Sequence, residues 1–344
     1  MEITKKITSQ KHCDILGIGS PLLDIVINIE ETMFCELNMK KGSMNLISAK
    51  ESRDMLKKFG HIKQKITPGG SVANTLSGAS ALGNKTSFLG VIGKDIYGQT
   101  YQTEIKNEGI VSHLTCHTSD TTGHAIIFVT PDGERTMATH LGAALRFEKE
   151  HIKEDQIKNS QILHIEAYQL ENSDTCQAIL HAIKIAKDNN VTISLDLSDV
   201  GLIQRNRKLF KSIVKEHIDV VFANEAEAVA FTGKNDSITA LHEIAKACDI
   251  AVVKLGAKGS LIKKGEKIFN IQPYPVDMVN TNGAGDTYAA GILHGLINGL
   301  DLQDAGEIAS HISALVVASV GARLDKKYIK SISKYKRHGK ETRL

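Results

Sequence analysis

Six short runs rich in isoleucine and valine recur along the chain, each bounded by glycine, asparagine or aspartate. Runs of this length and composition, with turn residues at their ends, predict β-strands. The predicted strands cover residues 14–18, 86–92, 162–166, 191–197, 218–222 and 250–255.

Longer amphipathic stretches separate these runs and predict helices. They lie near residues 73–82, 97–108, 175–188, 204–216, 238–247, 285–298 and 303–319. Alternating strands and helices are typical of an α/β fold, in which a mostly parallel sheet is covered by helices on both faces. We therefore expect three layers, α/β/α.

Two regions break this alternation. Residues 22–47 and 115–142 contain half-polar, strand-like patterns, and the second has a hairpin signal at Pro131, Asp132 and Gly133. We interpret both as a small β-sheet that projects from the core and serves as a lid. The expected organisation is one domain over residues 1–325, followed by a basic tail over 326–344.

The composition is that of an ordinary globular protein, with 42% hydrophobic and 24% charged residues in 344. The first dozen residues lack the apolar run of a signal peptide, and no stretch reaches the roughly 18 apolar residues of a membrane helix. The five cysteines are scattered without C-x-x-C spacing, which favours reduced thiols and no zinc site. We expect a cytoplasmic protein without a membrane partner.

The net charge of +3 is unevenly distributed. Residues 326–344 hold eight of the 42 lysines and arginines but one of the 39 acids, so the rest of the chain has a net charge of −4. A nucleic-acid-binding domain would carry its basic surface on the folded body, so we expect no nucleic-acid partner. The basic tail is interpreted as a solvated end, or as a contact for an acidic partner.

Residues 280–286 read NTNGAGD and precede an amphipathic helix. Glycines at a helix start let backbone N–H groups converge, and a helix N-terminus with its partial positive charge receives phosphate well. Asp286, in the first helical turn, would then stand beside the phosphate and could accept the proton of an attacking hydroxyl. A helix cap after a glycine turn is the purely structural alternative.

Residues 68–74 read PGGSVAN and open a helix of small residues. Adjacent glycines permit a ligand to approach the backbone closely, and the Asn74 amide offers both a donor and an acceptor to a sugar hydroxyl. The alternative is a tight turn with Ser71 as the helix cap.

Asn224 and Glu227 follow a predicted strand and lie three residues apart, on one helix face. An amide and a carboxylate at the end of a strand suit a hydrated Mg²⁺ bound to phosphates. An asparagine cap with an acid in the first turn is the alternative.

Residues 254–259 read KLGAKG and also follow a strand. A nucleotide could lie over this loop, or the loop could be a hairpin turn into the next residues. No Walker motif and no G-x-G-x-x-G fingerprint occurs in the chain. The four segments together nevertheless predict a ligand site, because all follow strand ends of one open sheet.

The paired signatures GGSVAN and TNGAGD, in this order, resemble those of the ribokinase-like (pfkB) family of carbohydrate and purine kinases. The resemblance covers about residues 13–324 and implies an α/β/α core with a β-sheet lid, ATP as phosphoryl donor and a requirement for Mg²⁺. Asp286 matches the family's catalytic base, and Gly283, Ala284 and Gly285 match its anion hole. Asn224 and Glu227 match the pair that organises Mg²⁺ through water, and Lys254, Gly256 and Gly259 fall in the segment that borders ATP.

Within this family the chain is most similar to the adenosine kinases. Residues 19–24 (GSPLLD) resemble their G-N-P-L-L-D, in which Asp24 would accept hydrogen bonds from two ribose hydroxyls. The remaining matches are Gly70, Ser71, Asn74 and Asn282 toward the ribose, Leu46, Met137 and Thr139 toward the base, and Arg135 toward the phosphates. Tyr168 could stack on the purine or be a core or rim residue.

Two positions depart from the family pattern. Ser20 replaces an asparagine, so its contact with the substrate would be shorter or mediated by water. Asn280 stands where the family has an aspartate that helps to order the anion hole and, in ribokinases, a monovalent-cation site. Because asparagine keeps the oxygen and loses the charge, we expect a weak dependence on K⁺, or none.

The resemblance implies ATP-dependent phosphorylation of the 5′-hydroxyl of adenosine, giving AMP and ADP in purine salvage. The alternatives are another nucleoside (inosine or guanosine), a free sugar (ribose or fructose), or a non-catalytic small-molecule sensor with the same fold. The family occurs as monomers and as dimers whose lid sheets pair, and both remain open.

Overall fold

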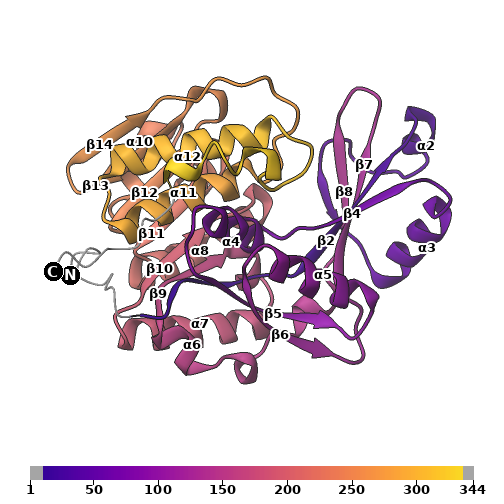
Figure 1. Ribbon diagram of the computed structural model, residues 1–344, viewed down its shortest axis with the longest axis horizontal. Coiled ribbons are helices and arrows are strands. Elements are labelled where there is room, and N and C mark those ends of the chain that lie inside the picture. The colour runs from indigo at the N-terminus through magenta and orange to yellow at the C-terminus, as the bar shows by residue number, and fades with distance from the viewer. Residues whose placement is uncertain (1–10, 336–344) are drawn as a thin grey trace.

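The computed structural model describes residues 11–335, which build two sheets with helices around them (Figure 1). The larger, central sheet has nine strands in the order β14-β13-β12-β11-β10-β9-β1-β5-β6. Seven strands from β6 to β12 run parallel, and β13 and β14 continue the sheet antiparallel. Their bounds are β1 (Cys13–Ile18), β5 (Thr86–Gly93), β6 (Val111–His117), β9 (Ser160–Glu166), β10 (Thr192–Asp196), β11 (Val220–Asn224), β12 (Ile250–Lys254), β13 (Ser260–Lys264) and β14 (Lys267–Ile271).

Helices cover both faces of this sheet. One face packs against α7 (Ser173–Asp188), α8 (Val200–His217), α9 (Glu225–Thr232) and α10 (Ser237–Ile244), with the short α6 (Glu154–Lys158) alongside. The other face packs against α4 (Ser71–Ala81), α5 (Ile96–Asn107), α11 (Ala284–Asn298) and α12 (Leu302–Val317). Side chains alternate between the two layers, as Ile15 and Leu16 of β1 do, so the strands are buried on both faces.

Small residues bring α4 and α11 close together. A Cβ atom added to Gly78 of α4 would lie 2.9 Å from the Cβ atom of Ala290 in α11. On the far side of α11, a Cβ atom at Gly291 would lie 2.4 Å from Cα of Ala309 in α12. Because the two helices pack at this short separation, the first turns of α4 and α11 become neighbours.

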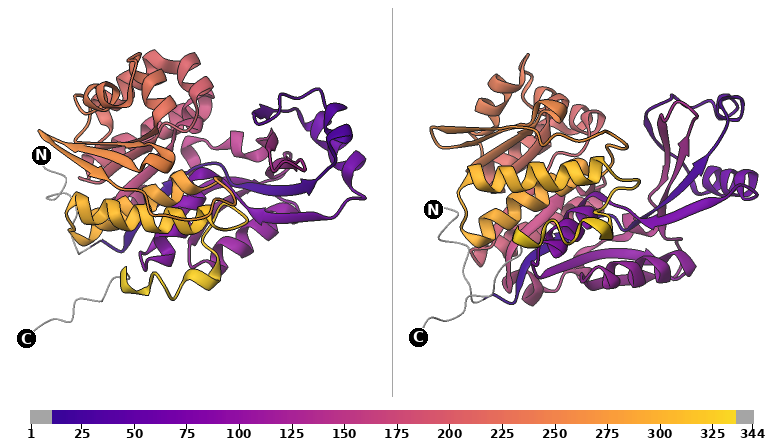
Figure 2. Two further views of the ribbon diagram at one scale, coloured as in Figure 1. Left: turned by 90° about the horizontal axis from the view of Figure 1, so that it is seen from above. Right: turned by 45° about the horizontal axis from the view of Figure 1, so that its top comes forward.

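The smaller sheet has the strand order β3-β8-β7-β2-β4 and projects from the core (Figures 1 and 2). Its strands are β2 (Leu22–Asn28), β3 (Met44–Leu46), β4 (Gln64–Pro68), β7 (Gly123–Val129) and β8 (Arg135–His140). Helices α2 (Glu31–Cys35) and α3 (Ala49–Phe59) cover one face, with Ile25, Phe34, Phe59 and Phe128 buried between. We call this unit the lid sheet.

Each predicted strand and helix of the core is present, and the α/β/α architecture is confirmed. The structure divides the second expected lid segment, 115–142, differently. Residues 111–117 form β6 at the edge of the central sheet, and the lid sheet resumes at Gly123. Strand β4 and helix α3 also belong to the lid unit and had no counterpart in the sequence interpretation.

The first part of the expected tail is folded. The 3-10 helices η5 (Lys326–Tyr328) and η6 (Ser333–Tyr335) follow α12, and Ile332 between them is buried against Leu82 and Ile312. Residues 336–344 lie outside the described part, as do residues 1–10 of the N-terminal segment. Between residues 11 and 335, no helix is long and apolar enough to cross a membrane.

Candidate active site

A cavity of about 550 Å³ lies between the lid sheet and the ends of the central strands. It is bordered by the last residues of β9, β10, β11 and β12 and by the first turns of α4 and α11. Apart from Arg135, every residue assigned to the site from the sequence lines this cavity. They are Ser20, Asp24, Leu46, Gly70, Ser71, Asn74, Met137, Thr139, Tyr168, Asn224, Glu227, Lys254, Gly256, Gly259, Asn282, Gly283, Ala284, Gly285 and Asp286.

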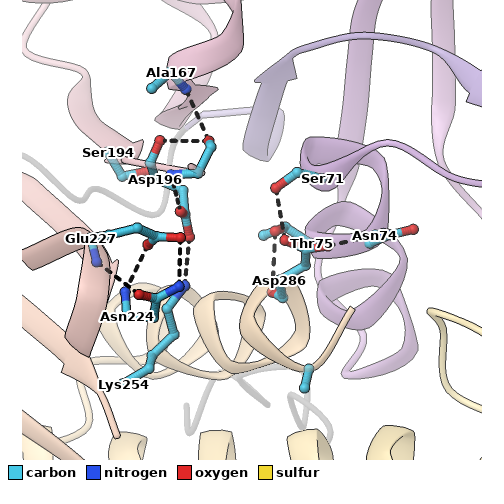
Figure 3. A network of polar contacts seen from close by, with 12 residues as sticks. Ser71, Asn74, Thr75, Ala167, Ser194, Asp196, Asn224, Glu227, Lys254 and Asp286 are labelled. Atoms are coloured by element: carbon cyan, nitrogen blue, oxygen red, sulfur yellow. Dashed lines mark hydrogen bonds and ion pairs between the residues drawn. The ribbon is translucent and has the colours of Figure 1, made fainter. Parts of the chain in front are cut away.

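Asp286 stands in the first turn of α11 and faces the first turn of α4 (Figure 3). Its Oδ1 accepts a hydrogen bond from Ser71 Oγ at 2.7 Å, and its Oδ2 accepts one from Asn74 Nδ2 at 2.9 Å. Burial raises the pKa of Asp286, and these two hydrogen bonds oppose the shift because they stabilise the carboxylate. Its orientation is thus fixed by two donors, and its basicity exceeds that of an ordinary aspartate.

The backbone before Asp286 forms an open helix start. Gly283 has φ 75°, and a Cβ atom there would lie 1.9 Å from the carbonyl oxygen of Ala322, so only glycine fits. Gly283, Ala284 and Gly285 border the cavity, where the first N–H groups of a helix have no acceptor within the helix. This end of α11 can therefore receive an anionic group beside Asp286.

Asn280 orders the loop that leads to this helix start. Its buried side chain donates from Nδ2 to the carbonyl oxygen of Gly321 at 2.6 Å, and its Oδ1 accepts from the backbone N–H of Asn282 at 3.0 Å. Both ends of the amide are used within the protein. A neutral residue thus holds the loop by hydrogen bonds alone.

Asn224 and Glu227 form a capping box at the start of α9. Asn224 Oδ1 accepts from the N–H of Glu227 at 2.9 Å, and Glu227 Oε2 accepts from the N–H of Asn224 at 2.7 Å. A further bond joins Asn224 Nδ2 to Glu227 Oε1 at 2.6 Å. The pair caps the helix and also borders the cavity, so the structural and functional interpretations are compatible.

Lys254 lies beside Asn224 and Glu227 at the border of the cavity. Its ammonium Nζ donates to Asp196 Oδ2 at 2.8 Å, and a Cβ atom added to Gly285 would lie 3.0 Å from Nζ. The loop after Lys254 is a β-hairpin turn closed by a hydrogen bond from Leu255 N to Gly259 O at 2.8 Å. Lys254 therefore places a positive charge next to the open start of α11.

Carboxylates outnumber ammonium groups in this half of the site. Asp196 and Glu227 are both buried and share Lys254 as their counter-charge, and burial together with Asp196 raises the pKa of Glu227. Among the described residues, no cluster of three or more histidine, cysteine or acidic side chains could hold a metal directly. Oxygen ligands with excess negative charge fit Mg²⁺, which usually keeps several waters and binds through few protein groups.

Asp24 lies in the opposite half of the cavity, on β2 of the lid sheet. Its carboxylate rests on the backbone of Gly69, where a Cβ atom would lie 2.3 Å from Oδ1. Burial raises the pKa of Asp24 to about 6, and the positive charges of Arg323 and Arg135 oppose this shift. Such a carboxylate at the border of the cavity is a strong acceptor for hydroxyl groups of a ligand.

Ser20 is bound within the protein rather than free. Its N–H donates to Glu166 Oε1 at 2.8 Å, and its Oγ accepts from Gln169 Nε2 at 2.7 Å. Glu166 also accepts from the N–H of Val72 at 3.1 Å, so one buried carboxylate joins the loop of Ser20 to the start of α4.

The wall above Asp24 is apolar. Met44, Leu46 and Met137 of the lid sheet contribute to it, together with Leu141 and Leu145. Tyr168, in the 3-10 helix η3 (Ala167–Leu170), borders the cavity and also packs against the core, which makes it a rim residue. Burial and nearby carboxylates raise its pKa, so its hydroxyl stays protonated.

Arg135 does not line the cavity. It begins β8 next to the β7–β8 turn, where it pairs with Val129, and its side chain is half-buried. Burial lowers its pKa, and the negative charge of Asp24 opposes that shift.

Glu166, Asp196 and Arg323 contact site residues and had no role in the sequence interpretation. Glu166 and Asp196 end β9 and β10, and an acid at the end of a predicted strand was a signal that could have revealed them. Arg323 lies between α12 and the 3-10 helix η5, and no local pattern marks it. Its buried guanidinium reaches Asn74 and Glu108.

Comparisons with known proteins bear on the family and the fold of the chain. A family model described as pfkB family carbohydrate kinase matches residues 36–327. A 5-dehydro-2-deoxygluconokinase of Clostridium perfringens is 28% identical over 286 residues, which span 79% of this chain and 85% of that protein. The adenosine kinase from Sinorhizobium meliloti has a TM-score of 0.88 at 28% identity, covering 95% of this chain and 99% of that one. A probable sugar kinase from Rhizobium etli CFN 42 has a TM-score of 0.87 at 29% identity, covering 94% and 97%.

Proposed function

The chain belongs to the pfkB family of carbohydrate kinases, and within that family we propose that it transfers the γ-phosphoryl group of ATP to the 5′-hydroxyl of adenosine. As a member of this family it is a phosphotransferase that acts on an alcohol group of a sugar or nucleoside. The nucleoside, the 5′ position and the roles of individual residues are our proposal.

The division of the cavity into a polar floor and an apolar wall carries the proposal. Asp24, Ser71 and Asn74 form the floor beside Asp286, and the apolar side chains of the lid sheet stand over it. Adenosine has the same division, because its ribose carries hydroxyls and its purine is flat and largely apolar. A free sugar would satisfy the floor and leave the wall without a partner.

The charges of the cavity argue against an acidic sugar. Among its described lining residues the cations are Arg205 and Lys254, and each is already paired, with Glu171 at 2.7 Å and with Asp196 at 2.8 Å. The half of the cavity proposed to hold the phosphoryl acceptor also contains the carboxylates of Asp24 and Glu166. A substrate such as 5-dehydro-2-deoxygluconate, on which the clostridial relative acts by name, would meet like charges there.

We assign the proton transfer to Asp286. As the 5′-oxygen bonds to the γ-phosphorus, the bond from that phosphorus to the bridging oxygen of ADP breaks, and the hydroxyl proton passes to the Asp286 carboxylate. The N-terminus of α11 and Lys254 would stabilise the charge that spreads over the transferring group. Asn224 and Glu227 would hold Mg²⁺ through water, and the ion would supply neutralisation of the phosphate charge.

The lid sheet would complete the site. Met44, Leu46 and Met137 reach the cavity from strands that are otherwise remote from the central sheet. Closure over a bound nucleoside would exclude water from the phosphoryl group and limit hydrolysis of ATP.

A panel of acceptors tests the proposal. Release of ADP from Mg-ATP would be measured with adenosine, inosine, guanosine, ribose, fructose and 5-dehydro-2-deoxygluconate. We expect adenosine to give the highest kcat/KM. A higher kcat/KM for a free sugar or the sugar acid would contradict the nucleoside assignment, and absence of ADP release with every acceptor would favour a sensor.

Two lid variants localise the base contact. Leu46→Asn places an amide on the cavity wall, and we expect it to raise KM for adenosine by about tenfold, the equivalent of roughly 1.4 kcal/mol. Ile66→Asn is the matched control, because Ile66 is also an exposed lid residue but does not border the cavity. Equal effects of the two variants would contradict a base contact at Leu46.

A further inference from the structure

Arg323 is a buried cation that connects the C-terminal segment to the floor of the site. Its side chain is 10% exposed. Nη1 donates to Glu108 Oε2 at 2.6 Å, Nε donates to Asn74 Oδ1 at 3.0 Å, and Nη2 donates to the carbonyl oxygen of Gly69 at 3.3 Å. One side chain thus contacts α4, the end of α5 and the glycine turn under Asp24.

Two neighbours determine how the Asn74 amide is turned, the Arg323 guanidinium and the Asp286 carboxylate. A side-chain amide can be turned so that its oxygen and nitrogen exchange places, and the two orientations differ only in their partners. A guanidinium is exclusively a donor, so the oxygen of Asn74 must face Arg323. The nitrogen is then directed at Oδ2 of Asp286, 2.9 Å away.

We infer that Arg323 is a positioning residue, which orients the Asn74 amide so that its N–H donates to the Asp286 carboxylate. Without a donor at the Nε position, the Asp286 carboxylate alone holds the amide in this orientation. Whenever the amide turns, two oxygens face each other, and the carboxylate loses one of the two hydrogen bonds that fix it. The inference rests on the proposed role of Asp286 as proton acceptor.

A purely structural role for Arg323 makes a different prediction. In that case its ion pair with Glu108 would hold the C-terminal segment on α5, and the activity would depend on the positive charge of residue 323. The two roles are separable because they use different atoms, Nη1 for Glu108 and Nε for Asn74.

Arg323→Gln and Arg323→Met form the matched pair that separates them. Both side chains are uncharged, are similar in length and lose the pair with Glu108. The glutamine nitrogen falls at the place of Nε and can still donate to Asn74, whereas methionine has a methyl group there. We expect kcat to fall about 10- to 100-fold in R323M, because one hydrogen bond to a charged group is lost. In R323Q we expect kcat to fall only a few-fold.

Three further measurements complete the test. In an Asn74→Ala background the difference between R323Q and R323M should vanish, and KM for ATP should stay within about twofold throughout, because the ATP half of the site is unchanged. Glu108→Gln should retain kcat within about threefold, since it leaves the Nε contact intact. Equal losses in R323Q and R323M, or a loss in E108Q as large as in R323M, would overturn the inference.

Thermal unfolding of each variant shows whether it is folded. If R323Q and R323M do not fold, Arg323→Lys takes their place, since it keeps a charge for Glu108 and loses the Nε donor. We then expect R323K to lose kcat about tenfold with KM for ATP unchanged, whereas full kcat would overturn the inference. Asp286→Asn, measured in parallel, separates the two proposals. Activity in D286N would refute the proposed base, whereas an inactive D286N with equal R323Q and R323M would refute only the role of Arg323.

Discussion

Asn74 and Asp286 are 212 residues apart in the chain, and a hydrogen bond of 2.9 Å joins their side chains. They come from the first turns of α4 and α11, which meet because Gly78 and Ala290 allow the two helices to pack closely. The candidate base is therefore oriented by a helix that belongs to the other end of the sequence. Its chemistry depends on this packing as well as on its own motif.

Acid should inactivate the enzyme at a higher pH than an ordinary aspartate would. Burial raises the pKa of both Asp286 and Asp24 above 3.8, the latter to about 6, and both are proposed to act as carboxylates. Activity therefore requires a pH above these raised values. The charge of Asp196 raises the pKa of Asp286 further, and the charge of Lys254 lowers it. The charge of Arg323 lowers the pKa of Asp24. We expect kcat/KM for adenosine to fall below about pH 6; a flat profile down to pH 4.5 would contradict the raised values.

Asp24→Asn should stabilise the free protein while it weakens substrate binding. The pKa of Asp24 is about 6 in the folded protein and has its ordinary value in the unfolded chain. The free energy of unfolding therefore falls as the pH rises from about 4 to 6, and it stays at the lower value above pH 6. The free energy of unfolding of D24N at pH 8 should exceed that of the wild type by about 1–3 kcal/mol. At pH 4 the two should agree, and denaturant titrations at both pH values check this. A D24N protein that is less stable than the wild type at pH 8 would refute the destabilising effect assigned to the Asp24 carboxylate.

Glu227→Gln should raise the Mg²⁺ concentration that gives half-maximal rate. The substitution removes one of the two carboxylates that share Lys254 and leaves much of the capping box in place. We expect an increase of about tenfold, typical of groups that hold a metal through its outer shell. Glu225→Gln is the control, since Glu225 lies exposed in the same helical turn. Identical Mg²⁺ curves for E227Q and the wild type would remove Glu227 from the metal site.

Turnover should not depend on K⁺. Asn280 orders the loop before α11 with both ends of a neutral amide, through Gly321 and Asn282, and supplies no charge for a monovalent cation. Rates in Na⁺, K⁺ and a large organic cation at equal ionic strength should be equal. A strong requirement for K⁺ would show that the loop binds a cation without the aspartate.

The location of the site could be predicted because it depends on local features. Strand ends, glycine turns and helix starts are each readable over a few residues, and in a parallel sheet they gather at one edge. This is why Asp24, Asn74, Asn224 and Asp286, from four separate segments and expected at one site, line the same cavity.

What could not be predicted depends on contacts between distant segments. Arg323 has no motif, and its importance appears only when the C-terminal segment lies against Asn74 and Glu108. Residues 115–117, the end of the edge strand β6, were assigned to the lid because a strand with one exposed side has the same half-polar pattern in either sheet. Lys254 was assigned to the segment that borders ATP, and only the structure shows it paired with Asp196 beside the start of α11.

The central claim is that Asp286 accepts the proton of a nucleoside hydroxyl, and single-turnover transfer from ATP to adenosine tests it most directly. Formation of AMP would be followed in the wild type and in Asp286→Asn, with the affinity for ATP measured on both. We predict AMP from the wild type and a rate at least about 10²- to 10⁴-fold lower in D286N, with ATP affinity unchanged. Comparable rates in the two proteins, or no AMP from the wild type, would contradict the account.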